Sequence, residues 1–188
     1  MRIAYRLISQ TGLEGLRTRE VAAAAGIDTG TLHYHFPSKQ ALIQAVVDHL
    51  AEDFRAARAR SGTLPADALD ELRNEILDVA ARVRESPEQL LVILELTLRA
   101  SRDGSVAEVL ARMQQDWTDS LTGLLGRGIA QGVFRPDLQP EAAALALRAQ
   151  LTGMALVAMA APGRTEAIAT ALFMQMKSWL LKPQPDLW

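Results

Sequence analysis

Apolar residues recur every three or four positions along most of the chain, which is the spacing of one face of an α-helix. The pattern is clearest in a long segment after Pro37, where Leu42, Val46, Leu50 and Phe54 follow one another at four-residue intervals. No stretch alternates apolar and polar residues with β-branched side chains, as a half-buried strand would. The sequence therefore predicts an all-α protein.

Glycine, proline and capping residues divide this pattern into about nine predicted helices. Thr18 and Asp28 are expected to cap the second and third helices, and Gly26 to end the second. Capping boxes at residues 86–89 and 105–108 indicate the starts of the sixth and seventh. The expected helices cover about residues 3–10, 18–25, 29–36, 38–62, 66–85, 87–102, 105–128, 141–161 and 165–181, followed by a loose tail at 182–185.

Residues 18–36 have the features of a helix-turn-helix motif. Such a motif needs a small residue where its two helices touch and a residue that tolerates a left-handed backbone in the turn, and Ala22 and Gly26 meet these needs. The apolar residues expected to seat the second helix on the first are Val21, Ile27, Leu32 and Phe36, which leaves Thr29, Thr31, His33, Tyr34 and His35 more exposed.

The same stretch resembles the DNA-binding domain of the TetR family of transcriptional regulators. The segments Gly30-Thr31-Leu32 and Tyr34-His35-Phe36, followed by Lys39, are similar to the recognition-helix pattern of that family. The resemblance is specific over about residues 3–50 and looser beyond them. His33 departs from it, because the family usually has tyrosine there, and the nearness of Met1 to the first helix leaves open whether an N-terminal arm precedes it.

The resemblance implies a set of DNA-contacting residues. Thr29 and Tyr34 are expected to approach base edges, and Gly30 to let the backbone come close to the duplex. Arg19 and Lys39, each at the start of a helix, are expected to contact phosphates, which agrees with the free amides and positive dipole end of a helix N-terminus. The other members of the set are expected near phosphates or bases: Thr31, His33 and His35.

The resemblance also implies two domains, a DNA-binding domain over residues 1–48 and a regulatory, ligand-binding and dimerisation domain over residues 49–188. The last two long helices are expected to pair with their twins in a four-helix bundle, giving a homodimer on a palindromic operator. Repression is the expected outcome, because a bound dimer obstructs polymerase; an activator and a helical interaction protein that does not bind DNA are the alternatives. Apolar residues that support the bundle are Leu145, Leu151, Leu156, Ile168, Leu172, Met176 and Leu180.

A small, largely apolar effector is expected between the sixth, seventh and eighth helices. The residues expected to line its site are Leu94, Met113, Trp117, Leu151 and Met154, although solid core is the default interpretation for any one such residue. Glu95 interrupts an apolar stretch in the sixth helix. It is expected to pair with Arg99 at the surface, and a carboxylate in an apolar pocket wall is the alternative.

Composition narrows the function further. The chain has no cysteine, which excludes disulfides and thiolate metal sites. His33 and His35 lie about 200° apart on a helix and cannot grip one metal ion. There is also no glycine-rich phosphate loop and no Ser/His/Asp set on plausible turns, so neither an enzyme nor a cofactor is expected.

Charge and hydropathy bear on the partners. The net charge is −2, but residues 1–40 carry five Arg or Lys against three Asp or Glu, as expected of a small DNA-binding head on an acidic body. No charged-then-apolar leader opens the chain. Arg148, Gln150 and Thr152 interrupt the most apolar stretch, residues 142–161, so no membrane span is expected and the predicted location is the cytoplasm.

Overall fold

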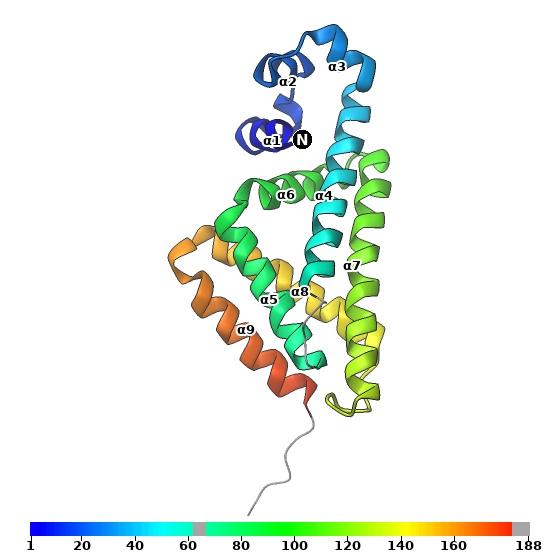
Figure 1. Ribbon diagram of the computed structural model, residues 1–188, viewed down its shortest axis with the longest axis vertical. Coiled ribbons are helices and arrows are strands. Elements are labelled where there is room, and N and C mark those ends of the chain that lie inside the picture. The colour runs from blue at the N-terminus through cyan, green and yellow to red at the C-terminus, as the bar shows by residue number, and fades with distance from the viewer. Residues whose placement is uncertain (62–66, 182–188) are drawn as a thin grey trace, which may run out of the picture. The chain divides into compact units, whose positions relative to one another are not determined.

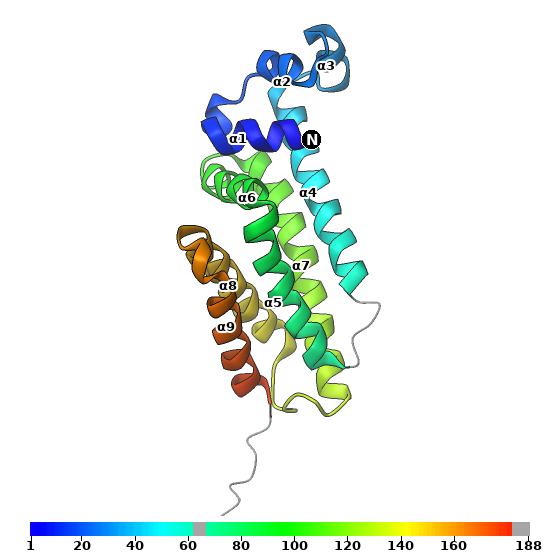
Figure 2. The ribbon, with the colours of Figure 1, turned by 60° about the vertical axis from the view of Figure 1, so that its left-hand side comes forward.

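The computed structural model describes residues 1–61 and 67–181. The predicted all-α fold is confirmed, since these residues form nine α-helices and one short 3-10 turn, and no strand occurs among them (Figures 1 and 2). The predicted tail at 182–185 lies outside the described residues. In chain order the elements are α1 (Arg2–Gly15), α2 (Thr18–Ala25), α3 (Thr29–His35), α4 (Lys39–Ser61), α5 (Ala68–Glu85), α6 (Pro87–Ala100), α7 (Gly104–Ala130), α8 (Pro140–Ala160), η1 (Pro162–Arg164) and α9 (Thr165–Leu180).

The helices gather into two compact units. Unit 1 comprises residues 1–55 and 86–114, and unit 2 the described parts of 56–85 and 115–188. Unit 1 extends beyond the predicted 1–48 domain because α6 lies along α1 (Figure 1). This is a division by packing, and the functional boundary near residue 48 stays a prediction.

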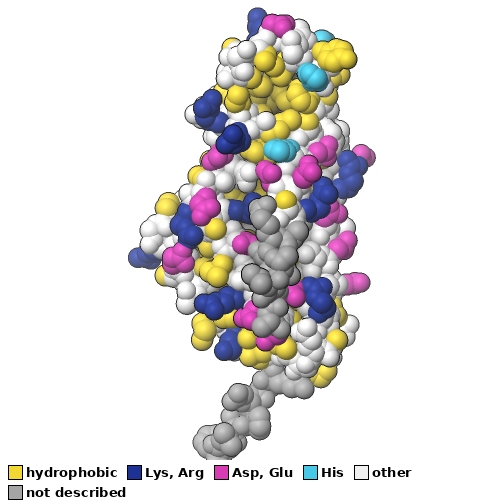
Figure 3. Space-filling model, in the orientation of Figure 1, with side chains coloured by type: hydrophobic (Ala, Val, Ile, Leu, Met, Phe, Trp, Pro, Cys, Tyr) yellow, Lys and Arg dark blue, Asp and Glu magenta, His cyan; other side chains and the backbone are white. Residues whose placement is uncertain are grey.

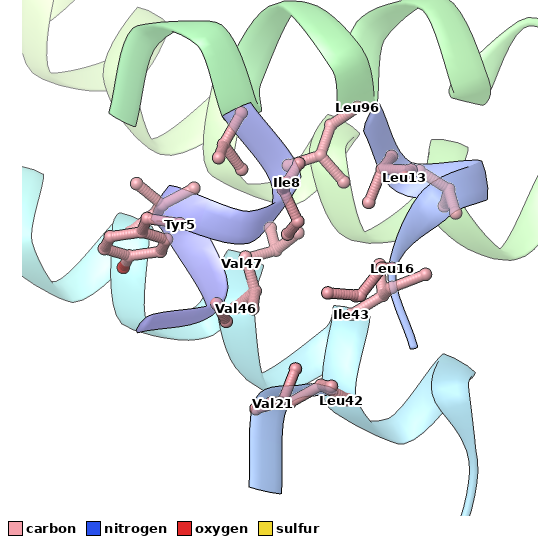
Figure 4. Packing of buried hydrophobic residues seen from close by; sticks show 14 of the residues in the cluster. Tyr5, Ile8, Leu13, Leu16, Val21, Leu42, Ile43, Val46, Val47 and Leu96 are labelled. Carbon is pink, nitrogen blue, oxygen red and sulfur yellow. The ribbon is translucent and has the colours of Figure 1, made fainter. Parts of the chain in front are cut away.

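The core of unit 1 joins α1, α2, α3, α4, α6 and the first part of α7. Ile8 and Leu13 of α1, Val46 of α4 and Leu96 of α6 belong to this cluster, and all four are almost fully buried (Figure 4). Burying one such side chain contributes roughly 1.5–3 kcal/mol to folding. Leu32, the buried residue of α3, belongs to the same cluster, so the core fixes the helix predicted to read DNA.

Two of the helix boundaries follow the predicted chemistry. Gly26 ends α2 in the left-handed conformation with a φ of 68°, and Ile27 N donates to Ala22 O at 3.1 Å across the turn. The side chain of Asp28 caps α3 as expected. In α1 the backbone leaves the helical conformation at Gly12 (φ 68°, ψ 171°), but helical turns continue to Gly15.

Two predicted caps are wrong, and a third lacks its side-chain bond. Thr18 is the first residue of α2, whose N-cap position is Arg17, and no side chain caps that helix. Ser86 occupies the N-cap position of α6 and Pro87 begins the helix, as predicted, but the Ser86 side chain makes no capping bond. At α7 the cap is Asp103, whose Oδ1 accepts from the backbone N of Ser105 at 3.2 Å. Spacing alone could not distinguish these neighbouring polar residues.

In unit 2, α5 packs against α8 and α9, and α8 and α9 also pack against each other (Figure 2). Leu147 and Leu151 of α8 are fully buried, whereas Leu145 and Leu156 are 51% and 43% exposed. By length and composition alone α8 would pass for a membrane span. Its buried face lies in the core of unit 2, and a core helix of a soluble protein passes the same test.

Candidate nucleic-acid interface

The short helix α3 presents an almost continuous polar surface. Leu32 is its buried residue, and every residue of the set predicted for this helix is exposed. Tyr34 is the most open at 85% exposed, and Figure 3 shows histidine side chains at the surface over α3. The exposed members are Thr29, Gly30, Thr31, His33, Tyr34 and His35.

Asp28 organises the first turn of α3. Its Oδ1 accepts from the backbone N of Gly30 at 2.6 Å and of Thr31 at 3.1 Å, and its Oδ2 accepts from Thr31 Oγ1 at 2.5 Å. The bond from the Thr31 hydroxyl and those from the two amides hold the pKa of Asp28 below its ordinary value of 3.8, so the carboxyl is ionised at neutral pH. These two amides are therefore not free to bind a phosphate.

The same cap accounts for Gly30. A Cβ added at position 30 would lie 2.8 Å from Asp28 Oδ1, which is closer than such contacts allow. The glycine is thus required by the local structure of α3. Whether it also lets the backbone approach a duplex stays a prediction.

The apolar seat of α3 differs from the prediction at one residue. Val21 and Leu32 are buried and Phe36 packs against the same cluster, as expected. Ile27 is 39% exposed. It follows the left-handed Gly26 directly, in the turn between α2 and α3.

The two basic residues predicted to contact phosphates have different surroundings. Arg19 is exposed on α2. Lys39 is partly buried, and its Nζ donates to the backbone O of Glu14 at 3.2 Å, the oxygen that also accepts from Arg17 Nη1 at 2.6 Å. Burial lowers the pKa of Lys39, Glu14 opposes that shift, and Arg17 and Arg99 add to it.

Two side chains of α6 hold the end of α1. Glu95 Oε2 accepts from the backbone N of Leu13, directly after the kink at Gly12, at 3.3 Å. Arg99 forms ion pairs with Glu14 and Asp103. The predicted surface pair of Glu95 with Arg99 is therefore wrong. No local pattern predicts the contacts of Glu95 with Leu13 and of Arg99 with Glu14, because each joins residues more than 80 positions apart.

The residues predicted to line an effector site divide between the units. Leu94 and Met113 belong to unit 1, where Met113 packs against the core. Trp117, Leu151 and Met154 belong to unit 2. Leu151 and Met154 are buried, whereas Trp117 is partly exposed.

Trp117 has a polar neighbour that the sequence did not reveal. Its Nε1 donates to Glu75 Oε1 of α5 at 2.6 Å. Tryptophan has a single polar hydrogen, so this bond fixes the orientation of the indole ring. No ligand contact of the five predicted residues is tested by these observations, and their role stays a prediction.

Two family models match the chain. The model of bacterial regulatory proteins of the tetR family matches residues 1–46, which include α1, α2 and α3. The C-terminal model of the BetI-type transcriptional repressor matches residues 65–176. The first of these models includes all the residues of α3 described above.

Two transcriptional regulators of similar sequence and one solved structure support the assignment made by these family models. The transcriptional repressor KstR2 of Mycobacterium tuberculosis is 25% identical over 145 residues, which are 75% of this chain and 70% of that protein. The regulator UidR of Escherichia coli is 25% identical over 136 residues, 72% of this chain and 67% of that protein. The structure of GusR from Salmonella enterica superposes with a TM-score of 0.79 at 28% identity, over 97% of this chain and 93% of GusR. The chain therefore belongs to the TetR family of bacterial regulatory proteins and is a DNA-binding transcriptional regulator rather than an enzyme.

Proposed function

We propose that this protein is a homodimeric repressor that binds a palindromic operator and is released from it by a small effector. The observation that carries the proposal is α3, which is anchored by Leu32, capped by Asp28 and exposed over the rest of its surface. A helix held in this way enters the major groove without losing further backbone entropy. Relatives named as repressors, KstR2 among them, support repression over activation.

In this proposal base contacts and phosphate contacts come from different helices. Tyr34 and Thr29 reach base edges from α3, while Arg19 and Lys39 contact phosphates and fix the register of the protein on the duplex. The start of α2 suits a phosphate better than that of α3, because no side chain caps it. Lys39 reaches a phosphate only if its ammonium leaves, or shares, the carbonyl of Glu14.

The dimer is proposed to form through α8 and α9. Large apolar side chains remain exposed on both helices, and a twin subunit would cover them. One α3 per chain contacts few base pairs, so a two-fold dimer doubles the recognised sequence and makes it palindromic. The exposed residues are Leu145, Leu156, Val157 and Met174.

The effector is proposed to be small and largely apolar and to bind in unit 2 beside Trp117, Leu151 and Met154. Glu75 places a carboxylate beside this group, because it accepts a hydrogen bond from the indole of Trp117. Leu94 and Met113, which the sequence also predicted for the effector site, belong to unit 1 and are not part of this proposal. Since operator DNA is the proposed partner, the proposed location is the cytoplasm.

Selection of bound duplexes from a random pool tests the proposal. We expect the protein to enrich a palindrome with half-sites about one helical turn apart, roughly 34–36 Å, or a multiple of that distance. The Tyr34→Ala variant serves as the control, because this side chain is 85% exposed and its loss should reduce enrichment of the palindrome without unfolding the protein. Enrichment of no sequence, or of sequences without two-fold symmetry, would overturn the proposal.

A further inference from the structure

We propose that Asp28 sets the hydrogen-bond polarity of Thr31, so that Thr31 reads a base with an exocyclic amino group, adenine or cytosine, at one position of each operator half-site. The inference rests on the proposed function of α3 as the helix in the major groove. It assigns Asp28 a part in base selection, and it narrows the role of Thr31 from phosphates or bases to bases alone.

The polarity follows from counting hydrogens. An ionised carboxylate carries no hydrogen and can only accept, so the 2.5 Å contact between Thr31 Oγ1 and Asp28 Oδ2 requires the threonine hydroxyl to donate. A hydroxyl has a single hydrogen. Once this hydrogen is on Asp28, Thr31 Oγ1 can only accept from a further partner.

Asp28 itself is also restricted to accepting. Its Oδ1 already accepts from two backbone amides, and its Oδ2 has capacity for one more donor besides the Thr31 hydroxyl. Thr31 and Asp28 are both exposed. Together they present oxygen acceptors and no donor beside the surface of α3.

The position of Thr31 on α3 places its acceptor oxygen beside the surface proposed to face the DNA. Thr31 precedes Tyr34 by three residues, so the two lie next to each other on the helix surface. Leu32 is the buried residue of α3 and marks the side away from the duplex. The side chain of Thr31 is therefore on the flank of the surface that Tyr34 presents.

Only some groups of DNA are complementary to an acceptor. In the major groove adenine N6 and cytosine N4 donate, whereas guanine O6 and N7 and thymine O4 accept. Phosphate oxygens accept as well. An acceptor-only Thr31 cannot bond to a phosphate and favours adenine or cytosine over guanine or thymine on the strand that it faces.

Replacement of Asp28 by asparagine tests this directly, because the amide lifts the acceptor-only restriction on Thr31 without removing the cap. In the Asp28→Asn variant Oδ1 can still accept from Gly30 and Thr31, and asparagine caps helices as well as aspartate does. Its Nδ2 would donate to Thr31 Oγ1, which releases the hydroxyl hydrogen toward the DNA. Thr31 can then donate as well as accept.

Selection from a random pool with both proteins gives the measurement. We expect the preference for adenine or cytosine at one position of each half-site to relax in Asp28→Asn, so that guanine and thymine are also accepted there, while the other positions keep their preference. A mismatched base pair commonly costs about 1–3 kcal/mol, so the wild type should prefer adenine or cytosine at this position by about 5- to 150-fold in affinity, and Asp28→Asn should lose most of this preference.

Two variants of Thr31 complete the test. Thr31→Ser keeps the hydroxyl and should keep the adenine or cytosine preference, and Thr31→Val keeps the shape and should lose it. The wild type would instead prefer thymine if Thr31 contacted the thymine methyl group through its own methyl group. Such a preference, surviving in Thr31→Val and disappearing in Thr31→Ser, would overturn the inference. An unchanged preference in Asp28→Asn would overturn it too, whereas failure of the wild type to enrich any sequence would overturn the proposed function itself.

Discussion

Tyr34 and Arg19 are both exposed in the DNA-binding head, but their chemistry suits different parts of a duplex. The phenol of Tyr34 can contact base edges, whereas the guanidinium of Arg19 neutralises a phosphate. We expect Tyr34→Ala to weaken operator binding by about 5- to 150-fold and to change binding to random DNA little. Arg19→Ala should weaken both and reduce the slope of log affinity against log salt by about 1.

Titration of both variants against operator and random duplexes at several salt concentrations measures this difference. Equal losses on the two duplexes for Tyr34→Ala would contradict its assignment to bases. An unchanged salt slope for Arg19→Ala would remove that residue from the phosphate contacts.

Asp28 gives the stability of the head a dependence on pH. Its pKa in the folded protein lies below the ordinary value of 3.8, because its carboxylate accepts from the Thr31 hydroxyl and from two amides. Near this value the unfolded chain binds more protons at this site than the folded protein does. The stabilisation by the cap is therefore complete well above pH 3.8 and is lost as pH falls toward the lower, folded pKa.

Urea unfolding of the wild type and Asp28→Asn between pH 7 and pH 3 checks this sign. The wild type should lose more of its free energy of unfolding on acidification, since asparagine does not titrate. Asp103, whose pKa is lowered for a similar reason, is present in both proteins and cancels in the comparison. If the free energies of unfolding of the two proteins fall in parallel with pH, the charge of Asp28 does not contribute to stability through the cap.

The junction after α7 depends on the absence of a side chain at Gly128. A Cβ at this position would lie 2.0 Å from Cδ2 of Phe134, whose ring is fully buried. The chain turns back there, with Phe134 N donating to Gly128 O at 3.0 Å, so the ring cannot move aside easily. We expect Gly128→Ala to lower the free energy of unfolding by about 1–3 kcal/mol.

The neighbouring Gly126 provides a matched control for α7. No atom lies within 4 Å of a Cβ added there, and alanine is a better helix former than glycine. Gly126→Ala should therefore raise the free energy of unfolding, by at most about 1 kcal/mol. Thermal or urea unfolding distinguishes the two variants, and a loss of similar size in both would show that α7 rejects alanine for another reason.

At the scale of elements, local chemistry predicted the helices and the cap of α3, but it did not predict the long-range contacts. The apolar period and the turn residues predict the nine helices, and an aspartate followed by a small polar segment predicts the cap of α3. The bond from Leu13 to Glu95 and that from Trp117 to Glu75 escaped prediction. Periodicity tells which side of a helix is buried, but it does not tell which other helix covers that side.

Over the whole molecule, the uneven distribution of charge reconciles an acidic protein with an anionic partner. The net charge is −2, yet the first 40 residues carry a small positive excess. Orientation on DNA therefore favours the α1–α3 end over the acidic remainder. This excess is small, so specific affinity must come from the local contacts of α3 and, in the proposed dimer, from the use of two copies of it.

The proposed dimer depends on the apolar side chains that one chain leaves exposed on α8 and α9. Leu156 is 43% exposed, and the two-fold axis of a dimer would bury it twice, once in each subunit. Burial of a leucine contributes roughly 1.5–3 kcal/mol, and an unpaired carboxylate in its place adds a desolvation cost. We expect Leu156→Glu to raise the dimer dissociation constant at least about 100-fold.

Leu98 of α6 is the matched control, because it is 58% exposed but lies on neither helix of the proposed bundle. Leu98→Glu should sediment as a dimer, like the wild type, at concentrations where Leu156→Glu sediments as a monomer. The monomeric variant should keep the helical circular dichroism of the wild type and lose most operator affinity, since each half-site is then bound separately. If Leu156→Glu stays dimeric, or if Leu98→Glu dissociates to the same extent, the subunits meet through another surface, and the spacing of the two α3 helices must be derived from that surface instead.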